Sequence, residues 1–151
     1  YAEIEATYLV PEGSSIQSVR DVDRNGVRIG VYGRSAYGLW LADNVANAEL
    51  VKTDSVDASF DCFVSGSLDV LAGLRPRLID DAKHLPGSRL LDGQFTAVQQ
   101  AIGTSPELTA SITFLRDFVE EAKSSGLVAE LIARHGVEGQ LTVAPPVDPS
   151  Q

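Results

Sequence analysis

Three residues that could bind an anion, Gly33, Arg34 and Ser35, stand where a buried strand over residues 27–32 is predicted to meet a helix. A helix start exposes free backbone N–H groups and the positive end of the helix dipole, so it can hold an anion. Arg34 would add a two-pronged charged donor, Gly33 would let backbone approach a ligand, and Ser35 would cap the helix. The pattern indicates a carboxylate-binding loop, although a capped helix with a surface arginine would use the same residues.

The sequence has no arrangement typical of a metal, nucleotide or nucleophile site. His84 and His135 lie far apart and no Cys-x-x-Cys pattern accompanies them, so a zinc site is not expected. There is no GxSxG elbow, no Walker loop and no dinucleotide fingerprint. Cys62 stands beside Phe60 and Phe63 on a predicted helix, which favours a small buried residue over a nucleophile.

Two pairs of adjacent carboxylates are the remaining candidates for acid–base chemistry. They are Asp80 with Asp81 and Glu120 with Glu121. Neighbouring residues on a helix point about 100° apart, so neither pair can converge on one substrate atom. We therefore predict that both pairs lie on solvated helix faces.

The elements that must position these residues alternate between strand and helix from residue 27 to residue 91. This alternation predicts βαβ units and an α/β fold with a mainly parallel sheet flanked by helices. Helices are expected to start after Ser35, after Asp54 or Ser55, and at Pro76. The predicted strands cover residues 4–10, 27–32, 50–51, 68–71, 88–91 and 95–102. The first helix carries apolar residues at helical spacing, at Leu39, Ala42, Val45 and Ala46.

The last third of the chain predicts two helices and a loose tail. Ser105 is the expected cap and Pro106 the first residue of a long helix. That helix has an apolar stripe at Leu108, Ile112, Leu115, Phe118 and Val119. Gly126 should end it, and a shorter helix should end at Gly136. The Pro-rich segment 143–151 is predicted to be loose.

Composition excludes several classes of partner. The chain has 151 residues with a net charge of −9, and 44% of the residues are hydrophobic. A nucleic-acid or anionic-membrane partner needs a basic face, so neither is expected. No apolar run approaches the ~20 residues of a membrane-spanning helix.

Four segments resemble the bacterial extracellular solute-binding proteins of the amino-acid type (family 3), which are the receptors of ABC importers and have the type II periplasmic-binding-protein fold. They are residues 4–41, with "VRIGVYGRSA", residues 63–78, with "FVSGSLDVLAGL", residues 86–108 and residues 114–136. Together they span about residues 4–144. Each motif is degenerate alone, and their order and spacing make the resemblance specific.

The family fold implies a domain organisation for this chain. Family members have two α/β lobes joined by two crossover strands, with the ligand in the cleft between the lobes. The resemblance implies an outbound strand, a second lobe, a return strand, two helices belonging to the first lobe, and a tail. These cover residues 1–10, 11–98, 99–104, 105–136 and 137–151. Most of the first lobe would precede Tyr1 and is not in this sequence.

The resemblance also implies ligand-binding residues. They are Tyr32, Gly33, Arg34, Ser35, Ala36, Ala72, Gly73, Leu74 and Gln99. The loop from Tyr32 to Ala36 matches the segment that meets the ligand's carboxylate. Leu74 stands where many members have an aspartate for the ligand's ammonium, which counts against an ordinary α-amino acid. Asp69 matches an aspartate that supports the lobe rather than the ligand.

Two further arginines, Arg75 and Arg77, lie close to these positions in sequence. Ligand-facing arginines would suit a more anionic solute, but solvated side chains are the favoured interpretation. No metal and no cofactor is implied. The resemblance therefore predicts a receptor for a small amino-acid-like solute or organic acid.

The expected partners and setting follow from the same resemblance. The family implies a periplasmic or extracellular protein, with or without a membrane anchor, that carries a signal peptide in its precursor and docks on a membrane permease. A ligand-sensing domain of a membrane receptor and a cyclic-acid dehydratase are the alternatives. Because the lobe that would cover the stripe from Leu108 to Val119 is missing, we also expect this chain to form a homodimer through that face.

Overall fold

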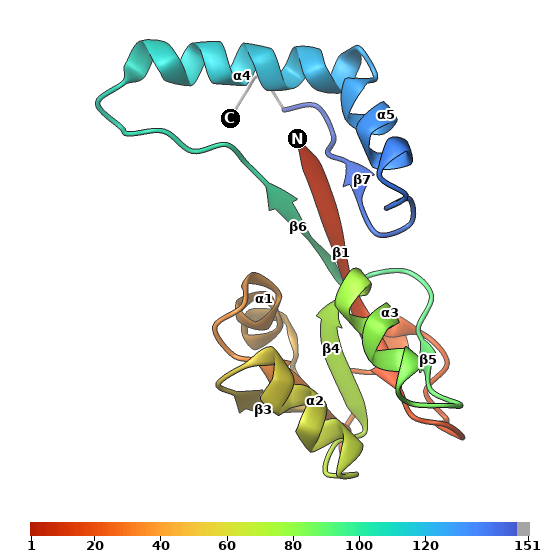
Figure 1. Cartoon of the computed structure of the whole chain (residues 1–151). Coiled ribbons are helices and arrows are strands. Elements are labelled where there is room, and N and C mark those ends of the chain that lie inside the picture. Colours follow the sequence, from red (N-terminus) through yellow and green to blue (C-terminus); the bar gives the residue numbers. More distant parts are fainter. Residues whose placement is uncertain (148–151) are drawn as a thin grey trace. The chain divides into compact units, whose positions relative to one another are not determined.

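The computed structural model describes residues 1–147, without the side chains of residues 109 and 110. It separates into two compact units. The sheet unit is Glu5–Val98, and the helical unit combines Tyr1–Ile4 with the chain from Gln99 onward. Figure 1 shows these segments coloured along the chain.

The sheet unit is built on a mixed sheet with strand order β3-β2-β4-β1-β5. The strands are β1 (Ala2–Val10), β2 (Arg28–Tyr32), β3 (Glu49–Thr53), β4 (Val70–Leu74) and β5 (Arg89–Leu90). β2 is parallel to β3 and to β4, as the βαβ pattern predicts, whereas β1 is antiparallel to β4 and β5.

Three helices connect these strands, preceded by the short 3₁₀ helix η1 (Val19–Asp21). They are α1 (Ala36–Asn44), α2 (Val56–Val64) and α3 (Arg75–Lys83). Ser35 and Ser55 cap α1 and α2, because their hydroxyl oxygens accept hydrogen bonds from the N–H groups of Gly38 and Ala58. Pro76 lies in the first turn of α3, as predicted.

The sheet is covered on both faces, with α1 on one and α2 and α3 on the other. Side chains along each strand alternate between two core clusters, since successive residues of a strand point to opposite faces. On the α1 side the strands contribute Ala6, Tyr8, Val10, Ile29, Val31, Val70 and Ala72. On the α2 and α3 side the cluster contains Leu9, Phe63, Leu68, Leu71 and Leu78.

The buried face of α1 differs from the predicted one. Leu39 and Ala42 are exposed, whereas Tyr37, Gly38 and Leu41 are buried. A Cβ atom on Gly38 would lie 2.3 Å from the carbonyl oxygen of Tyr32. The missing side chain therefore lets the first turn of α1 lie directly on the end of β2, and this contact sets the rotation of the helix.

The helical unit contains α4 (Thr109–Ser124), α5 (Leu127–Arg134) and β7 (Thr142–Val143), together with the end of β6 (Thr96–Gln100). Gly126 separates the two helices in a left-handed conformation, φ 83°, as its position predicts. The predicted helix start at Ser105 is wrong, because α4 begins at Thr109. The carbonyl of Ser105 instead accepts a hydrogen bond from the Leu108 N–H, which closes a turn with Pro106 at its second position.

Two further predictions about this unit need correction. The tail is ordered as far as it is described, because Val143 pairs with Ala2 of β1 and Lys123 donates to the carbonyl of Pro145 at 2.8 Å. Residues 148–151 of the predicted tail lie outside the described residues. Glu120 is not on a solvated face, because it pairs at 2.6 Å with the nearly buried Lys123 side chain.

Candidate functional site

The carboxyl ends of β2, β3 and β4 share one edge of the sheet, because β2 is parallel to both neighbours. The loops that start α1, α2 and α3 all leave from this edge. In open α/β sheets, ligands bind outside the carboxyl ends of the strands. The predicted anion-binding loop, from Tyr32 to Ala36, is the connection from β2 to α1 and lies at this edge.

Hydrogen bonds at both of its ends hold the β2–α1 loop. The N–H of Gly33 donates to the carbonyl of Thr53 in β3 at 3.1 Å. The Ser35 hydroxyl donates to the carbonyl of Tyr32 at 2.7 Å and accepts from the N–H of Gly38 at 2.9 Å. The loop is therefore preformed, since it is tied both to the neighbouring strand and to the first turn of α1.

Two N–H groups at the start of α1 remain available. Those of Ala36 and Tyr37 donate to none of the described residues. The N–H of Ser35 is not available, because it donates to the carbonyl of Tyr32 at 3.1 Å. Arg34 is exposed, and its side chain pairs with none of the described residues. An anion at this loop would thus meet two free N–H groups and one free guanidinium.

Gly38 is a site-building residue that the sequence reasoning missed. Its Cβ would also lie 2.9 Å from the Ser35 hydroxyl, so any side chain would disturb both the end of β2 and the cap. A glycine three residues after a capping serine could have signalled this close approach. Gly33 is less constrained, because a Cβ there would meet the Lys52 side chain at 3.2 Å.

A buried polar group lies beside the first turn of α1. Tyr37 is buried, and burial raises the pKa of its phenol, although the nearby Ser35 hydroxyl and the charge of Arg77 act in the opposite direction. The phenol therefore stays neutral at physiological pH. Beneath the β2–α1 loop it contributes a packed aromatic ring and a neutral hydroxyl group.

Neither Arg75 nor Arg77 is free at this edge, and neither is the solvated side chain we predicted. Arg77 pairs with Asp81 at 2.7 Å and with Asp57 at 2.8 Å. Arg75 pairs with Glu5 at 2.5 Å and donates to the carbonyl of Gly93 at 2.7 Å. Both guanidinium groups tie α3 to its surroundings, so Arg34 is the one of these three arginines whose guanidinium has no partner among the described residues.

The solvated prediction for Asp81 is wrong for the same reason. Asp81 is 5% exposed, and its partner is Arg77. Burial raises the pKa of its carboxyl group, and the hydrogen bond and charge of Arg77 offset that rise in part. The side chain is thus held in a buried ion pair on α3.

The other predicted ligand residues have different settings. Ala72 is buried in the core on the α1 side, and Gly73 lies beneath Leu78, whose side chain a Cβ would approach to 2.9 Å. Leu74 is half-buried at the end of β4, directly before α3. Gln99 belongs to the helical unit, where its side-chain amide donates to Glu3 at 2.8 Å.

Asp69 supports the lobe, as the resemblance implies. Its carboxylate accepts from the backbone N–H of Arg28 at 2.9 Å and from Nε of the same residue at 3.1 Å. Burial works against the charged form, but the bonds from Arg28 outweigh it and hold the pKa of Asp69 below its usual value. The pair fixes the beginning of β2 against the beginning of β4.

Two other classes of site were sought in residues 1–147. No group of three or more His, Cys, Asp or Glu side chains within that range could hold a metal ion. None of its helices combines the length and the apolar character needed to cross a bilayer.

Comparisons with known proteins identify the fold. No family model and no curated protein matches the chain. Among solved structures, a mutant of ArgBP from T. maritima matches with a TM-score of 0.62 and 17% identity, over 90% of this chain and 59% of that one. The ancestral amino-acid-binding protein AncCDT-1, described as a precursor of cyclohexadienyl dehydratase, matches with a TM-score of 0.64 and 17% identity, over 87% and 57% of the two chains.

A third solved structure widens the range of ligands seen on this fold. A periplasmic binding protein from Brucella ovis with glutathione bound matches with a TM-score of 0.53 and 12% identity, over 82% of this chain and 42% of that one. An ancestral cyclohexadienyl dehydratase matches as well, so the fold occurs in enzymes too. The chain spans less than two thirds of the length of these proteins, and its fold is that of the periplasmic binding proteins.

Proposed function

We propose that this chain supplies the second lobe, crossover strands and C-terminal helices of a receptor that binds a small amino-acid-like solute or organic acid for an ABC importer. The observation that carries the proposal is the β2–α1 loop. It presents free N–H groups at Ala36 and Tyr37 and an unpaired guanidinium at Arg34, at the carboxyl edge of a parallel sheet. The loop is preformed, which lowers the entropic cost of binding.

The chemistry of this edge favours a solute whose carboxylate is its main recognised group. Leu74 stands at the end of β4, and its apolar side chain offers no carboxylate to an ammonium group of the ligand. Asp57 and Asp81 are both engaged by Arg77, whereas Asp54, directly after β3, is exposed and pairs with none of the described residues. An organic acid, or an amino-acid-like solute whose ammonium group is bound by Asp54 or by another part of the receptor, fits these residues best.

The fold comparisons support a binding role over catalysis. ArgBP, the ancestral arginine-binding protein and the glutathione-bound protein are binding proteins by their descriptions. The buried carboxylate at this edge, Asp81, is paired with Arg77. A receptor of this kind would work in the periplasm or outside the cell and would dock on a membrane permease; a ligand-sensing domain of a membrane receptor would use the same site.

A titration of the full-length protein tests the proposed site. Trp40, the single tryptophan of the sequence, lies on α1 and can report binding by its fluorescence. Its ring packs at a tilt against that of Phe95, with 5.6 Å between the ring centroids. A thermal-shift screen of organic acids and amino acids would supply the ligand. Arg34→Ala should weaken its binding by about tenfold or more, because charge-assisted hydrogen bonds are lost.

A matched control removes another exposed arginine of the same unit. Arg20→Ala lies in η1, away from the carboxyl edge, and should leave the affinity within about twofold of the wild type, as expected for a screened surface charge. Unchanged affinity in Arg34→Ala, with a ligand that binds the wild type, would refute the assignment of the loop.

A further inference from the structure

A second pocket of the sheet unit lies at the edge opposite the β2–α1 loop. Its volume is about 850 Å³. Four loops line it: the segment after β1, the turn before β2, the turn between α2 and β4, and the turn between α3 and β5. These loops meet because β1 is antiparallel to β4, so that β1 ends where β2 and β4 begin. Pockets of about 300–1,000 Å³ are typical of small-molecule sites.

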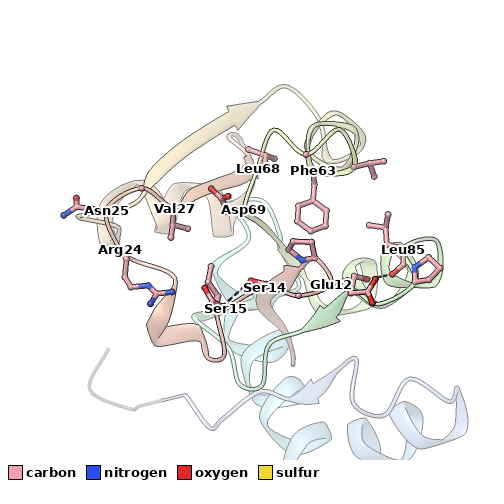
Figure 2. A pocket seen from close by; sticks show the side chains of 18 residues that line it. Glu12, Ser14, Ser15, Arg24, Asn25, Val27, Phe63, Leu68, Asp69 and Leu85 are labelled. Carbon is pink, nitrogen blue, oxygen red and sulfur yellow. Dashed lines mark hydrogen bonds between the residues drawn. The ribbon is translucent and has the colours of Figure 1, made fainter.

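One side of this pocket is apolar and is anchored in the core. Phe63 and Leu68 are 6% and 4% exposed, and both belong to the cluster beneath α2 and α3. Leu85 and Pro86 continue this side from the turn after α3. Figure 2 shows Phe63 and Leu85 toward one side of the pocket. A ligand with apolar side chains would therefore contact a surface that the fold already holds in place.

Two opposite charges stand apart from each other around the same pocket. Figure 2 shows Arg24 on the side away from Phe63, and Glu12 near Leu85. Both residues are exposed, and neither side chain forms an ion pair or hydrogen bond with any described residue. Asp69, the other charged residue of the lining, is already engaged by Arg28. The two free charges are thus a cation and an anion at separate places.

Hydrogen bonds hold the segment after β1 on the rim of the pocket. The guanidinium of Arg89 donates to the carbonyls of Ser14 and Ile16, and the Ser14 hydroxyl accepts from the N–H of Ile16 at 3.3 Å. Gly13 and Gly26 adopt positive φ at its turns, 74° and 85°. The pocket is therefore formed before any ligand arrives, which favours binding.

We propose that this pocket binds a short zwitterionic peptide with apolar side chains, its carboxylate on Arg24, its ammonium group on Glu12 and its side chains against Phe63 and Leu85. In a free amino acid the ammonium and carboxylate groups are bonded to the same carbon, whereas Figure 2 shows Arg24 and Glu12 on different sides of the pocket. Each added residue of an extended peptide lengthens the chain by about 3.3–3.6 Å, so a peptide can span them. This site is independent of the solute site proposed above, which lies at the other edge of the sheet.

Three matched ligands test the proposal on the full-length protein. They are trileucine, N-acetyl-trileucine, which lacks the ammonium group, and trileucine amide, which lacks the carboxylate. Binding is followed by ¹H–¹⁵N NMR, with the amides of Gly26 and Gly66 reporting this pocket and that of Ala36 reporting the other edge. Trileucine should shift the first two amides and bind about twofold to fivefold more tightly than either capped peptide, as expected for exposed charges.

Variants then assign each charge. Arg24→Gln should abolish the preference for trileucine over its amide, and Glu12→Gln should abolish the preference over the acetylated peptide. Arg20→Gln, an exposed arginine of η1 outside the pocket, should change neither preference. Equal affinities of the three peptides for the wild type, shifts confined to Ala36, or no shift at millimolar peptide would each overturn the proposal.

Discussion

The sheet unit and the helical unit differ in how they treat their large apolar side chains. In the sheet unit most of them are buried in two clusters or partly buried against them, and the exposed ones among the described residues are Leu39, Trp40 and Val64. In the helical unit the buried apolar residues are mostly small, and many large ones are exposed. The exposed ones are Tyr1, Ile102, Leu108, Ile112, Phe114, Phe118, Leu127, Leu131 and Val147.

This difference indicates that the helical unit needs a partner surface to bury its apolar side chains, whereas the sheet unit does not. The sheet unit has helices on both faces of its sheet and can bury its own core. The helical unit exposes a stripe along α4, in which Phe114 and Phe118 stack on each other while being 68% and 48% exposed. A contiguous exposed patch of this kind usually marks an interface. The exposed stripe therefore supports our proposal that a second copy of this chain can cover α4.

The largest expected difference between the two units is the loss of folding stability when a large apolar side chain is removed. Leu41, which is 0% exposed, lies in the core beneath α1, and Leu41→Ala should lower the free energy of unfolding by about 2–5 kcal/mol. Phe118→Ala removes a larger side chain from α4 but should cost less than about 0.5 kcal/mol at concentrations low enough for the chain to be monomeric, because that surface is then solvated. Urea unfolding measures both, and equal losses would mean that the helical unit has a core of its own.

The next effect is on association. If two chains pair through α4, Phe118→Glu should raise the dimer dissociation constant at least about tenfold, or 1.4 kcal/mol, because a charge replaces an apolar contact. Sedimentation equilibrium at micromolar concentration measures it. Leu39→Glu, which alters an exposed apolar residue of the sheet unit instead, is the control and should leave the dimer intact. A 16.1 kDa monomer for the wild type would rule out this dimer.

A smaller effect concerns two serines that the sequence presented alike. Ser35 caps α1, so Ser35→Ala should cost about 0.5–2 kcal/mol of stability. Ser105 caps no helix, since α4 starts at Thr109, and Ser105→Ala should change stability by less than about 0.5 kcal/mol. Chemical denaturation of the two variants compares them directly. A similar loss in both would restore the predicted helix start at Ser105.

The smallest effect is on the pH dependence of stability. The pKa is raised for one carboxylate of the sheet unit and lowered for one of the helical unit, so their contributions change in opposite directions with pH. Burial raises the pKa of Asp81 in the folded state, so its contribution is complete below the unfolded pKa and is lost as pH rises through the folded pKa. The hydrogen bond from Lys123 lowers the pKa of Glu120, so its contribution is present above the unfolded pKa and is lost as pH falls through the folded pKa.

Urea midpoints between about pH 3 and pH 7 separate these two carboxylates. Relative to wild type, Asp81→Asn should gain stability as the pH rises, and Glu120→Gln should lose it. Trends of the same sign in both variants would contradict the burial of Asp81.

Local sequence determined the elements of this protein and their order. Alternating apolar residues, capping serines and Pro76 predicted β2, α1, α2 and α3 close to their observed bounds, because these signals act between residues near each other in the chain. The turn at residues 105–108 was misread, since Ser-Pro can begin either a turn or a helix. The Gly-Arg-Ser junction was likewise placed correctly at a strand-to-helix loop.

Tertiary structure decided which groups are free to act. Arg34, Arg75 and Arg77 look equivalent in the sequence, yet Arg75 and Arg77 are tied by carboxylates that are brought to them from β1, α2 and the next turn of α3. The rotation of α1 was set by the contact of Gly38 with the end of β2, which no helical periodicity records. Ion pairing and burial depend on residues distant in the chain, so the local pattern located the loop but could not identify its available donors.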